Sequence, residues 1–283
     1  MPKIENKYLR TIESISKRIV SGKKLDLKRF HPDLDKEIVR FIDSCSSSMF
    51  PLVFDDDDCG DSEQIDFLRR SSFVGRVFLN LSNILFYLGK CRDEAARISE
   101  SFLEKLPEIF EVLESDAQAC YEKDPACRSV DEAILCYPGF RAVMIFRIAH
   151  ELYLMGVEYL PRLLTEYAHR HTGIDIHPGA KIGRRFFIDH GTGVVIGETT
   201  VIGDDVVLYQ HVTLGAKKFE LQEDGNPVKG IKRHPNIGDN CVIYAGATIL
   251  GGLTTIGKNS VIGANVWLTH AVPENSIVKK GDA

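Results

Sequence analysis

Three short segments of the sequence place an imidazole beside a charged group. They are Asp175-Ile176-His177-Pro178, Asp189-His190-Gly191 and Arg233-His234-Pro235. A carboxylate near an imidazole fixes the tautomer of the ring and raises its basicity. A general base needs both properties to take a proton from a hydroxyl group, so these segments predict acid–base chemistry.

Each histidine also has a simpler interpretation. His177, stiffened by Pro178, is expected to satisfy local backbone groups at a turn, and His211 has no acidic neighbour in the sequence and is expected to be structural. His190, His211 and His234 could form a zinc triad only if neighbouring coils presented them together. Their irregular spacing does not favour that arrangement, and we expect no metal.

The chain from residue 174 onward has a repeat with a period of six, which must position these residues. Seventeen of the 23 glycines also lie from Gly173 onward. Such a period predicts short strands that turn at regular corners, three strands to a coil, with aliphatic side chains inside and coils about 4.8 Å apart. The aliphatic positions are Ile176, Ile182, Ile188, Ile196, Ile202, Leu208, Leu214, Ile237, Ile243, Ile249, Ile256, Ile262 and Leu268.

Two features depart from a plain repeat. The segments at Asp175 and at Asp189-His190 are separated by slightly less than one coil, so we expect them to approach each other across neighbouring coils. Residues 217–232 interrupt the repeat with a polar, charged insertion. This insertion is predicted to be either a flap over the site or a passive surface loop.

Residues 1–172 show helical spacing of apolar residues. One or two helices are predicted in residues 1–50 and two or three long ones in 61–121, and the acidic run Asp55–Asp58 is predicted to be a solvated turn. Asp124-Pro125 is typical of a helix start, where the aspartate is a cap. Two further helices are predicted, one carrying Phe140 and ending near Gly156, and one running from about Leu160 to Gly173.

Composition narrows the class of protein. The net charge of −5 argues against a nucleic-acid binder, because such a protein needs basic residues to neutralise phosphates. The sequence contains no apolar run of membrane-spanning length and no signal peptide. Its seven cysteines form no CxxC pair, which favours reduced thiols. We therefore expect a cytoplasmic protein that binds neither nucleic acid nor membrane.

Several runs closely resemble the serine O-acetyltransferase family. They are DIHPGAKIGRRFFIDHGTGVVIGETTVIG, VTLGA and RHPNIGDN, preceded by KDPA and PGFRAVMIFRIAHELY. The resemblance covers residues 120–272 strongly. It implies an α + β protein with an all-α helical domain at 1–172 and a catalytic left-handed parallel β-helix at 173–283, interrupted by the loop at 217–232.

The resemblance also implies a role for individual residues. His190 matches the catalytic base and Asp175 the carboxylate that orients it. Asp124 and Asp189 match acidic residues that hold serine, which for Asp124 replaces the capping interpretation, and Arg233 and His234 match residues that contact the substrate. Small residues that line the coenzyme A groove are matched by Gly215, Ala216, Ala245 and Ala264.

The implied activity is direct transfer of the acetyl group of acetyl-CoA to the hydroxyl of L-serine, giving O-acetyl-L-serine and CoA in the first step of cysteine biosynthesis. The family implies L-cysteine as a feedback inhibitor and a homotrimer, and in many members two such trimers pair into a dimer of trimers. A complex with O-acetylserine sulfhydrylase is not expected, because the tail that would dock there is absent from the sequence.

Two other functions compete with this one. The chain could acetylate another hydroxyl, such as that of a sugar or an antibiotic, or it could be a β-helix scaffold without catalysis. Asp124 and the Arg233-His234 pair favour a small zwitterionic acceptor over a sugar. A scaffold would have no reason to keep Asp175, Asp189 and His190 together.

Overall fold

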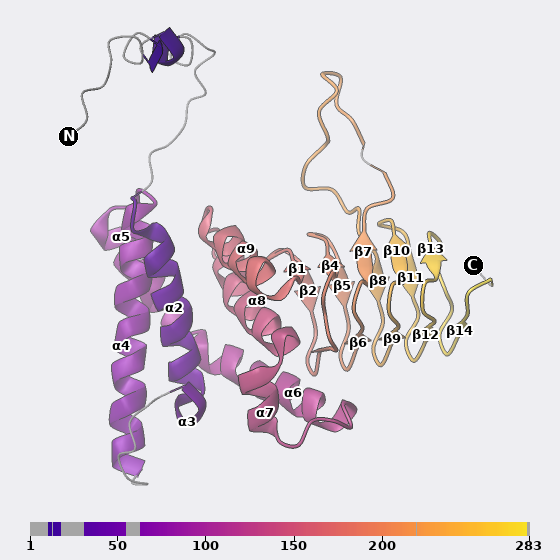
Figure 1. Ribbon diagram of the computed structural model, residues 1–283, viewed down its shortest axis with the longest axis horizontal. Helices are drawn as coiled ribbons and strands as arrows, with labels where there is room; N and C mark the ends of the chain where they lie inside the picture. The colour runs from indigo at the N-terminus through magenta and orange to yellow at the C-terminus, as the bar shows by residue number, and fades with distance from the viewer. Residues whose placement is uncertain (1–10, 13, 18–30, 55–62, 219, 282–283) are drawn as a thin grey trace. The chain divides into compact units, whose positions relative to one another are not determined.

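The computed structural model describes residues 11–12, 14–17, 31–54, 63–218 and 220–281, with the backbone alone for residues 52 and 63–66. Contacts divide the chain into two units, Met1–Pro32 and Asp33–Ala283. In the first unit, residues 11–12 and 14–17 are helical, within the stretch where helices are predicted. The predicted turn at Asp55–Asp58 lies outside the described residues. The second unit holds every element discussed below (Figure 1).

The first half of this second unit is helical, as the apolar spacing predicts. The helices α2, α4, α5 and α6 bury apolar side chains in one shared core, which includes the contacting rings of Phe41 and Phe102. The elements are α2 (Leu34–Met49), α3 (Pro51–Phe54), α4 (Glu63–Tyr87), α5 (Arg92–Leu103), α6 (Leu106–Lys123), α7 (Val130–Cys136), α8 (Pro138–Leu154) and α9 (Leu160–Thr172).

The predicted helix start at Asp124-Pro125 is wrong. Asp124 ends α6. Its Oδ1 accepts a hydrogen bond from the backbone N–H of Ala126 at 2.8 Å, which closes a turn. The next helix, α7, begins at Val130, where the side chain of Ser129 accepts from the N–H of Glu132. Because Asp124 does not cap a helix, its second carboxylate oxygen is available for another contact.

The described part of the second half contains fourteen short strands in three parallel sheets. The orders are β1-β4-β7-β10-β13 (sheet A), β11-β8-β5-β2 (sheet B) and β14-β12-β9-β6-β3 (sheet C). The strands are β1 (Asp175–Ile176), β2 (Lys181–Ile182), β3 (Phe187–Ile188), β4 (Val195–Ile196), β5 (Val201–Ile202), β6 (Val207–Leu208), β7 (Thr213–Gly215), β8 (Asn236–Ile237), β9 (Val242–Ile243), β10 (Thr248–Leu250), β11 (Thr255–Ile256), β12 (Val261–Ile262), β13 (Trp267–Leu268) and β14 (Ile277–Val278).

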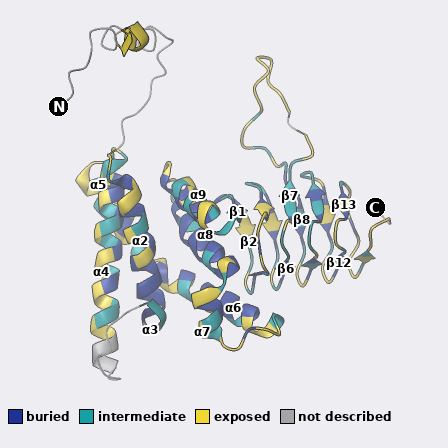
Figure 2. Ribbon diagram, in the orientation of Figure 1, coloured by how far each residue is buried: buried dark blue, intermediate teal, exposed yellow. Residues whose placement is uncertain are grey.

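The registers confirm the predicted three-strand coil. Along sheet A, Ile176 pairs with Ile196, Ile196 with Leu214, Leu214 with Ile249 and Ile249 with Leu268, and all five side chains are buried (Figure 2). Aliphatic residues therefore stack coil upon coil inside a triangular prism, as expected for a parallel β-helix.

Sheet A meets its neighbours at two corners of the prism. The His190 corner, where the chain passes from sheet C to sheet A, comprises residues 189–194, 209–212, 244–247 and 263–266. The Arg233 corner, where the chain passes from sheet A to sheet B, comprises residues 177–180, 197–200, 216–235, 251–254 and 269–271. The corner loop 189–194 is two residues longer than 209–212 on the next coil, which explains the shift in the repeat after Ile188.

The helices are fixed to the prism by a buried ion pair. Arg147 of α8 contacts Asp116 of α6 through Nε at 3.0 Å and Nη2 at 3.2 Å, and donates to the carbonyls of Ile182 and Gly183 at 2.6 Å. Asp116 Oδ1 also accepts from the N–H of Phe186. Since these hydrogen bonds satisfy both charged groups, the pair can hold α6 and α8 in one position on the first coil.

Close backbone packing brings α8 to the His190 corner. A Cβ atom at Gly139 would lie 2.1 Å from the carbonyl oxygen of Ile188. Only glycine therefore fits where the start of α8 crosses β3. At the end of α6, Lys123 forms an ion pair with Asp205 at 2.7 Å. Together these contacts place the segment between α6 and α8 next to residues 189–194.

Two other findings concern the described residues as a whole. None of the helices in this part of the chain has the length and apolar character needed to cross a membrane. The cysteines within it are all free thiols, at positions 45, 91, 120, 127, 136 and 241.

Candidate active site

His190 occupies the extended loop of the His190 corner. Its backbone has a φ of 58°, which lies in the left-handed region. Its side chain is 69% exposed, and its Nδ1 lies 3.9 Å from Oδ1 of Asp189. The two extra residues of this loop thus present an accessible imidazole with a carboxylate beside it.

Asp124 approaches the same corner from the helical half. Its Oδ2 accepts a 2.5 Å hydrogen bond from the hydroxyl of Tyr137, the residue that precedes α8. Burial, followed by this hydrogen bond, raises the pKa of the Tyr137 hydroxyl, which therefore remains a donor. Partial burial and the nearby charge of Asp124 also raise the pKa of Asp189, while His190 opposes that shift. Two carboxylates and one imidazole therefore lie at this corner.

Two tyrosines continue this corner along the prism. Tyr209 and Tyr244 stand on successive coils beyond Asp189 and stack with ring centroids 5.1 Å apart and planes at 11°. Burial and the charge of Asp189 raise the pKa of Tyr209. The aromatic pair forms an apolar wall beside the carboxylates, in line with the direction in which the coils stack.

Arg233 lies at the other edge of sheet A, at the Arg233 corner. Its Nη2 contacts Oε2 of Glu198 at 2.5 Å, and its side chain is 21% exposed. Although burial opposes ionisation of Glu198, the hydrogen bond and charge of Arg233 lower its pKa. The hydroxyl of Tyr153 on α8 is 3.5 Å from Oε1 of the same carboxylate. Arg233 is therefore already paired within the chain.

His234 is buried beside this ion pair. Its Nδ1 accepts a hydrogen bond from the backbone N–H of Thr199 at 3.1 Å, which puts the ring proton on Nε2. Burial, followed by the charge of Arg233, lowers the pKa of His234 to about 4. His234 is thus a neutral ring that can donate from Nε2. Nearby, His177 Nδ1 accepts from the N–H of Gly179 at 3.0 Å, which confirms the expected local role of His177.

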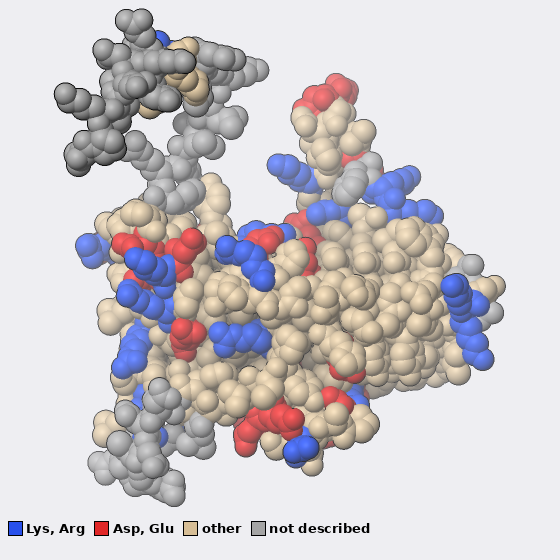
Figure 3. All heavy atoms as spheres, viewed as in Figure 1, with Lys and Arg blue, Asp and Glu red and all other residues tan. Residues whose placement is uncertain are grey.

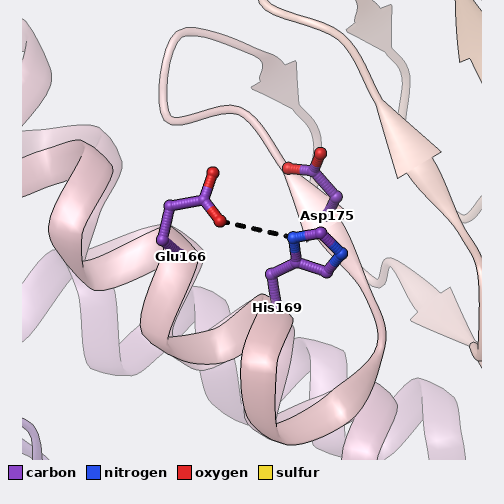
Figure 4. A group of neighbouring side chains, drawn as sticks. All are labelled: Glu166, His169 and Asp175. Atoms are coloured by element: carbon purple, nitrogen blue, oxygen red, sulfur yellow. Dashed lines mark hydrogen bonds and ion pairs between the residues drawn. The ribbon is translucent and has the colours of Figure 1, made fainter.

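Asp175 begins β1, on the coil that ends at the His190 corner. Its described ionic contact is with α9, where Arg162 Nη1 lies 3.8 Å from its Oδ1. Figure 4 shows Asp175 beside Glu166 and His169 of α9, and ligand atoms of these three residues lie within 4.8 Å of one another. Glu166 also pairs with Arg162 and, at 3.3 Å, with His169. A guanidinium already balances these carboxylates. The pairing of Asp175 with His190 stays a prediction.

The small residues expected to line the cofactor groove divide between the two corners. Ala245 and Ala264 occupy equivalent positions on successive coils of the His190 corner. Gly215 and Ala216 lie where β7 enters the Arg233 corner. Within one chain, the predicted site is therefore split between the two edges of sheet A, with Asp124, Asp189 and His190 at one edge and Arg233 and His234 at the other.

The structure adds residues that sequence reasoning missed. Tyr137 holds Asp124, Glu198 holds Arg233 and Thr199 fixes the tautomer of His234. Glu198 and Thr199 occupy a turn of the hexapeptide repeat, where the repeat itself requires no charged residue. Tyr137 precedes Pro138 and Gly139 at a helix boundary. In the sequence, this position indicates only where a helix begins.

Comparison with known proteins assigns the family. Residues 66–144 match the family model described as serine acetyltransferase, N-terminal. The structure resembles serine acetyltransferase 1 of Entamoeba histolytica in complex with L-cysteine, with a TM-score of 0.76, 35% identity, and coverage of 96% of this chain and 98% of that one. The chain belongs to the serine acetyltransferase family.

Two further comparisons agree with this membership. A plasmid-encoded serine acetyltransferase of Synechococcus elongatus is 54% identical over 186 residues, which are 66% of this chain and 58% of that relative. A serine acetyltransferase solved in complex with CoA has a TM-score of 0.57 and 28% identity, and covers 84% of this chain and 95% of its own. The prism is therefore the left-handed parallel β-helix of this family, as the resemblance implied.

Proposed function

We propose that this member of the serine acetyltransferase family transfers the acetyl group of acetyl-CoA to the hydroxyl of L-serine, with His190 as general base. The observation that carries the proposal is the exposed His190 imidazole beside Asp189, with Asp124 at the same corner. A carboxylate close to Nδ1 favours the tautomer protonated there, which leaves Nε2 free to accept a proton.

The reaction needs one proton acceptor and no covalent enzyme intermediate. Nε2 of His190 removes the proton of the serine hydroxyl as its oxygen attacks the thioester carbonyl. When the tetrahedral intermediate collapses, the C–S bond breaks and the imidazolium returns the proton to the departing thiolate. Asp175 and Asp189 stabilise the imidazolium, and the carboxylates at this corner attract the ammonium group of serine.

Arg233 binds the carboxylate of serine, a role supported by its planar guanidinium at the edge of the prism. Because Glu198 holds Arg233 in the free chain, the substrate carboxylate has to share or replace that contact. His234 supports it as a neutral donor. We propose that L-cysteine, the ligand in the Entamoeba histolytica structure, competes with serine for the same residues.

We propose that a second copy of the chain completes each site. A serine molecule cannot reach both edges of sheet A in one chain, whereas the Arg233 corner of one copy can face the His190 corner of the next in a head-to-tail ring. The outer face of sheet A supports this packing, because Val195 is 37% and Trp267 62% exposed. A homotrimer places Gly215 and Ala216 of one copy opposite Ala245 and Ala264 of its neighbour. In the same proposal, two trimers pair through their helical domains.

Within this arrangement we assign the catalytic β-helix to residues 173–283 and the helical domain, which contributes Asp124, to 1–172. Loop 217–232 lies next to Arg233 and is assigned to the cofactor side of the site. The cytoplasm is the proposed compartment, supported by the reduced thiols.

The test is release of free thiol from acetyl-CoA with three acceptors: L-serine, homoserine and a simple sugar alcohol. We expect release with serine far above the other two. Faster release with the sugar alcohol would favour an acetyltransferase of another class, and no release with any acceptor would favour a scaffold.

A further inference from the structure

A basic cavity lies beside the insertion that interrupts the repeat. Residues 216–218 and 220–235 project from the prism between β7 and β8 (Figure 1) as a hairpin, in which Val228 N–H donates to the carbonyl of Glu220. Between the base of this hairpin and the next two turns of the Arg233 corner is a cavity of about 430 Å³. Its lining includes Lys217, Lys218, Lys232, Gly251, Gly252 and Thr269.

The charge of this cavity is unbalanced. Acidic side chains gather at the tip of the hairpin and basic ones near its base (Figure 3). The carboxylate that lines the cavity belongs to Glu220, against three lysines and Arg233. Arg233 is neutralised by Glu198, but Lys232 Nζ donates only to neutral oxygens, those of Thr199 and Asn236. Neither Lys217 nor Lys218 has an ion-pair partner among the described residues.

The charged form of the Lys232 side chain is destabilised at the cavity. Burial, followed by the charge of Lys181, lowers the pKa of Lys232. An anion bound beside Lys232 would offset the repulsion between Lys232 and Lys181. The cavity is therefore suited to a negatively charged ligand.

The floor and the rim of the cavity suit a phosphate beside a flat apolar group. Gly251 has a φ of 106°, and a Cβ atom at Gly252 would lie 2.7 Å from the carbonyl oxygen of Lys232. The floor is therefore bare backbone. At the rim, the side chain of Leu253 is 96% exposed, and Ile231 lies in the same lining. Exposed aliphatic side chains next to lysines match a nucleotide, whose base is apolar on its faces and whose phosphate is anionic.

We propose that this cavity binds the phosphorylated adenosine end of acetyl-CoA, with Lys217 and Lys218 contacting its ribose 3′-phosphate. The enzyme would then discriminate against acetyl thioesters that lack this phosphate. This inference rests on the proposed function, and it adds a recognition element supplied by the insertion of this chain.

The level of the cavity along the prism agrees with such a ligand. Gly251 follows β10 and Thr269 follows β13, and the same strands are preceded by Ala245 and Ala264 of the groove. These strands lie two and three steps beyond β4 in sheet A. At the usual spacing of parallel strands, β10 lies roughly 10 Å and β13 roughly 14 Å from β4 along the axis of the prism. His190 directly precedes the corner residues that lead into β4. When the thioester of acetyl-CoA lies at His190, its adenosine end can therefore lie at the level of β10 and β13. In the proposed trimer, the cavity of one copy faces the groove of its neighbour.

The experiment compares acetyl-CoA with acetyl-3′-dephospho-CoA as donors for serine. For the unmodified enzyme we expect kcat/KM to be about tenfold higher with acetyl-CoA, the scale of a charge-assisted phosphate contact. The double variant Lys217→Gln/Lys218→Gln should lose most of this preference through a higher KM for acetyl-CoA, with the dephosphorylated donor unaffected. Lys258→Gln, on the same prism but between sheets B and C and outside the cavity lining, is the control and should behave like the unmodified enzyme.

Two results would overturn the inference: equal use of both donors by the unmodified enzyme, or a double variant that keeps the full preference. Calorimetric titration of the full chain with CoA and with 3′-dephospho-CoA gives the same comparison without turnover. An enzyme that binds CoA more tightly than its dephosphorylated form but does not acetylate serine would reject the proposed function and retain the cavity assignment.

Discussion

The two corners that flank sheet A differ in the exposure and the ion pairing of their charged residues. At the His190 corner, the imidazole is 69% exposed and the carboxylates of Asp124 and Asp189 form no ion pair with a lysine or arginine in the described part of the chain. At the Arg233 corner, Arg233 is 21% exposed and bonded to Glu198. Neighbouring carboxylates without a cation are costly, so their presence on a rigid coil indicates a ligand that supplies positive charge.

In the proposed function, this difference divides substrate recognition, at the Arg233 corner, from proton transfer, at the His190 corner. The Arg233 corner is stable by itself because its charges cancel, and it can exchange Glu198 for a substrate carboxylate of the same charge. The His190 corner keeps its imidazole accessible beside carboxylates that form no ion pair with a described lysine or arginine. A zwitterion such as serine complements both corners, since its ammonium suits one and its carboxylate the other.

Removing the base should have the largest effect. We expect His190→Ala to lower kcat by roughly 10²-fold or more, because the imidazole is the group proposed to take the serine proton. The rate of thiol release from acetyl-CoA measures kcat, and gel filtration checks that the assembly is intact. Near-normal turnover in an intact variant would mean that the base has been assigned to the wrong residue.

Removing the guanidinium should have a smaller effect on a different parameter. We expect Arg233→Ala to raise the KM for serine about tenfold, with less change in kcat, because a charge-assisted contact to the substrate carboxylate is lost. Inhibition by L-cysteine should be competitive with serine and should weaken by a similar factor. An unchanged KM with unchanged inhibition would place the carboxylate elsewhere.

Mixing the two variants tests whether the corners belong to different copies. In trimers reassembled from equal amounts of His190→Ala and Arg233→Ala chains, about a quarter of the head-to-tail interfaces combine two intact corners. At low serine we therefore expect activity about fivefold above the mean of the parent variants. Activity at that mean would indicate that each site lies within a single chain.

The pH dependence of stability should distinguish the buried ring at the Arg233 corner. The pKa of His234 is lowered to about 4, below the value of about 6.5 for an unfolded chain. The unfolded chain therefore binds a proton first, so the stabilisation is complete above about pH 6.5 and is lost as the pH falls toward 4.

Thermal melting at pH 7 and pH 4.5 measures this contribution. The melting temperature of the unmodified protein should fall more over that interval than the melting temperature of His234→Gln. His270→Gln removes an exposed histidine of the same prism and serves as the control. If His234→Gln loses as much stability on acidification as the unmodified protein, the ring is not held neutral by the fold.

Sequence reasoning predicted the prism and the helices well, because both depend on short-range periodicity. The six-residue spacing of aliphatic side chains required three strands to a coil, and Ile196 and Leu214 are stacked as that spacing predicts. It failed at Asp124, where a local capping signal was overridden by a turn that frees the carboxylate for Tyr137. A single-residue cap preference is worth about 1 kcal/mol, too little to resist packing against the prism.

By itself the sequence determined the coil, the depth of each aliphatic side chain and the kinds of chemical group at the corners, since a repeat specifies its own register. Only the tertiary structure decided which of these groups meet. Asp124 reaches the His190 corner because the Asp116–Arg147 pair and Gly139 fix α6 and α8 on the first coil, and Arg233 is directed to the other edge because sheet A separates the corners. The proximity of Asp124 and Asp189, which are 65 positions apart, depends on packing between elements, and no local spacing encodes it.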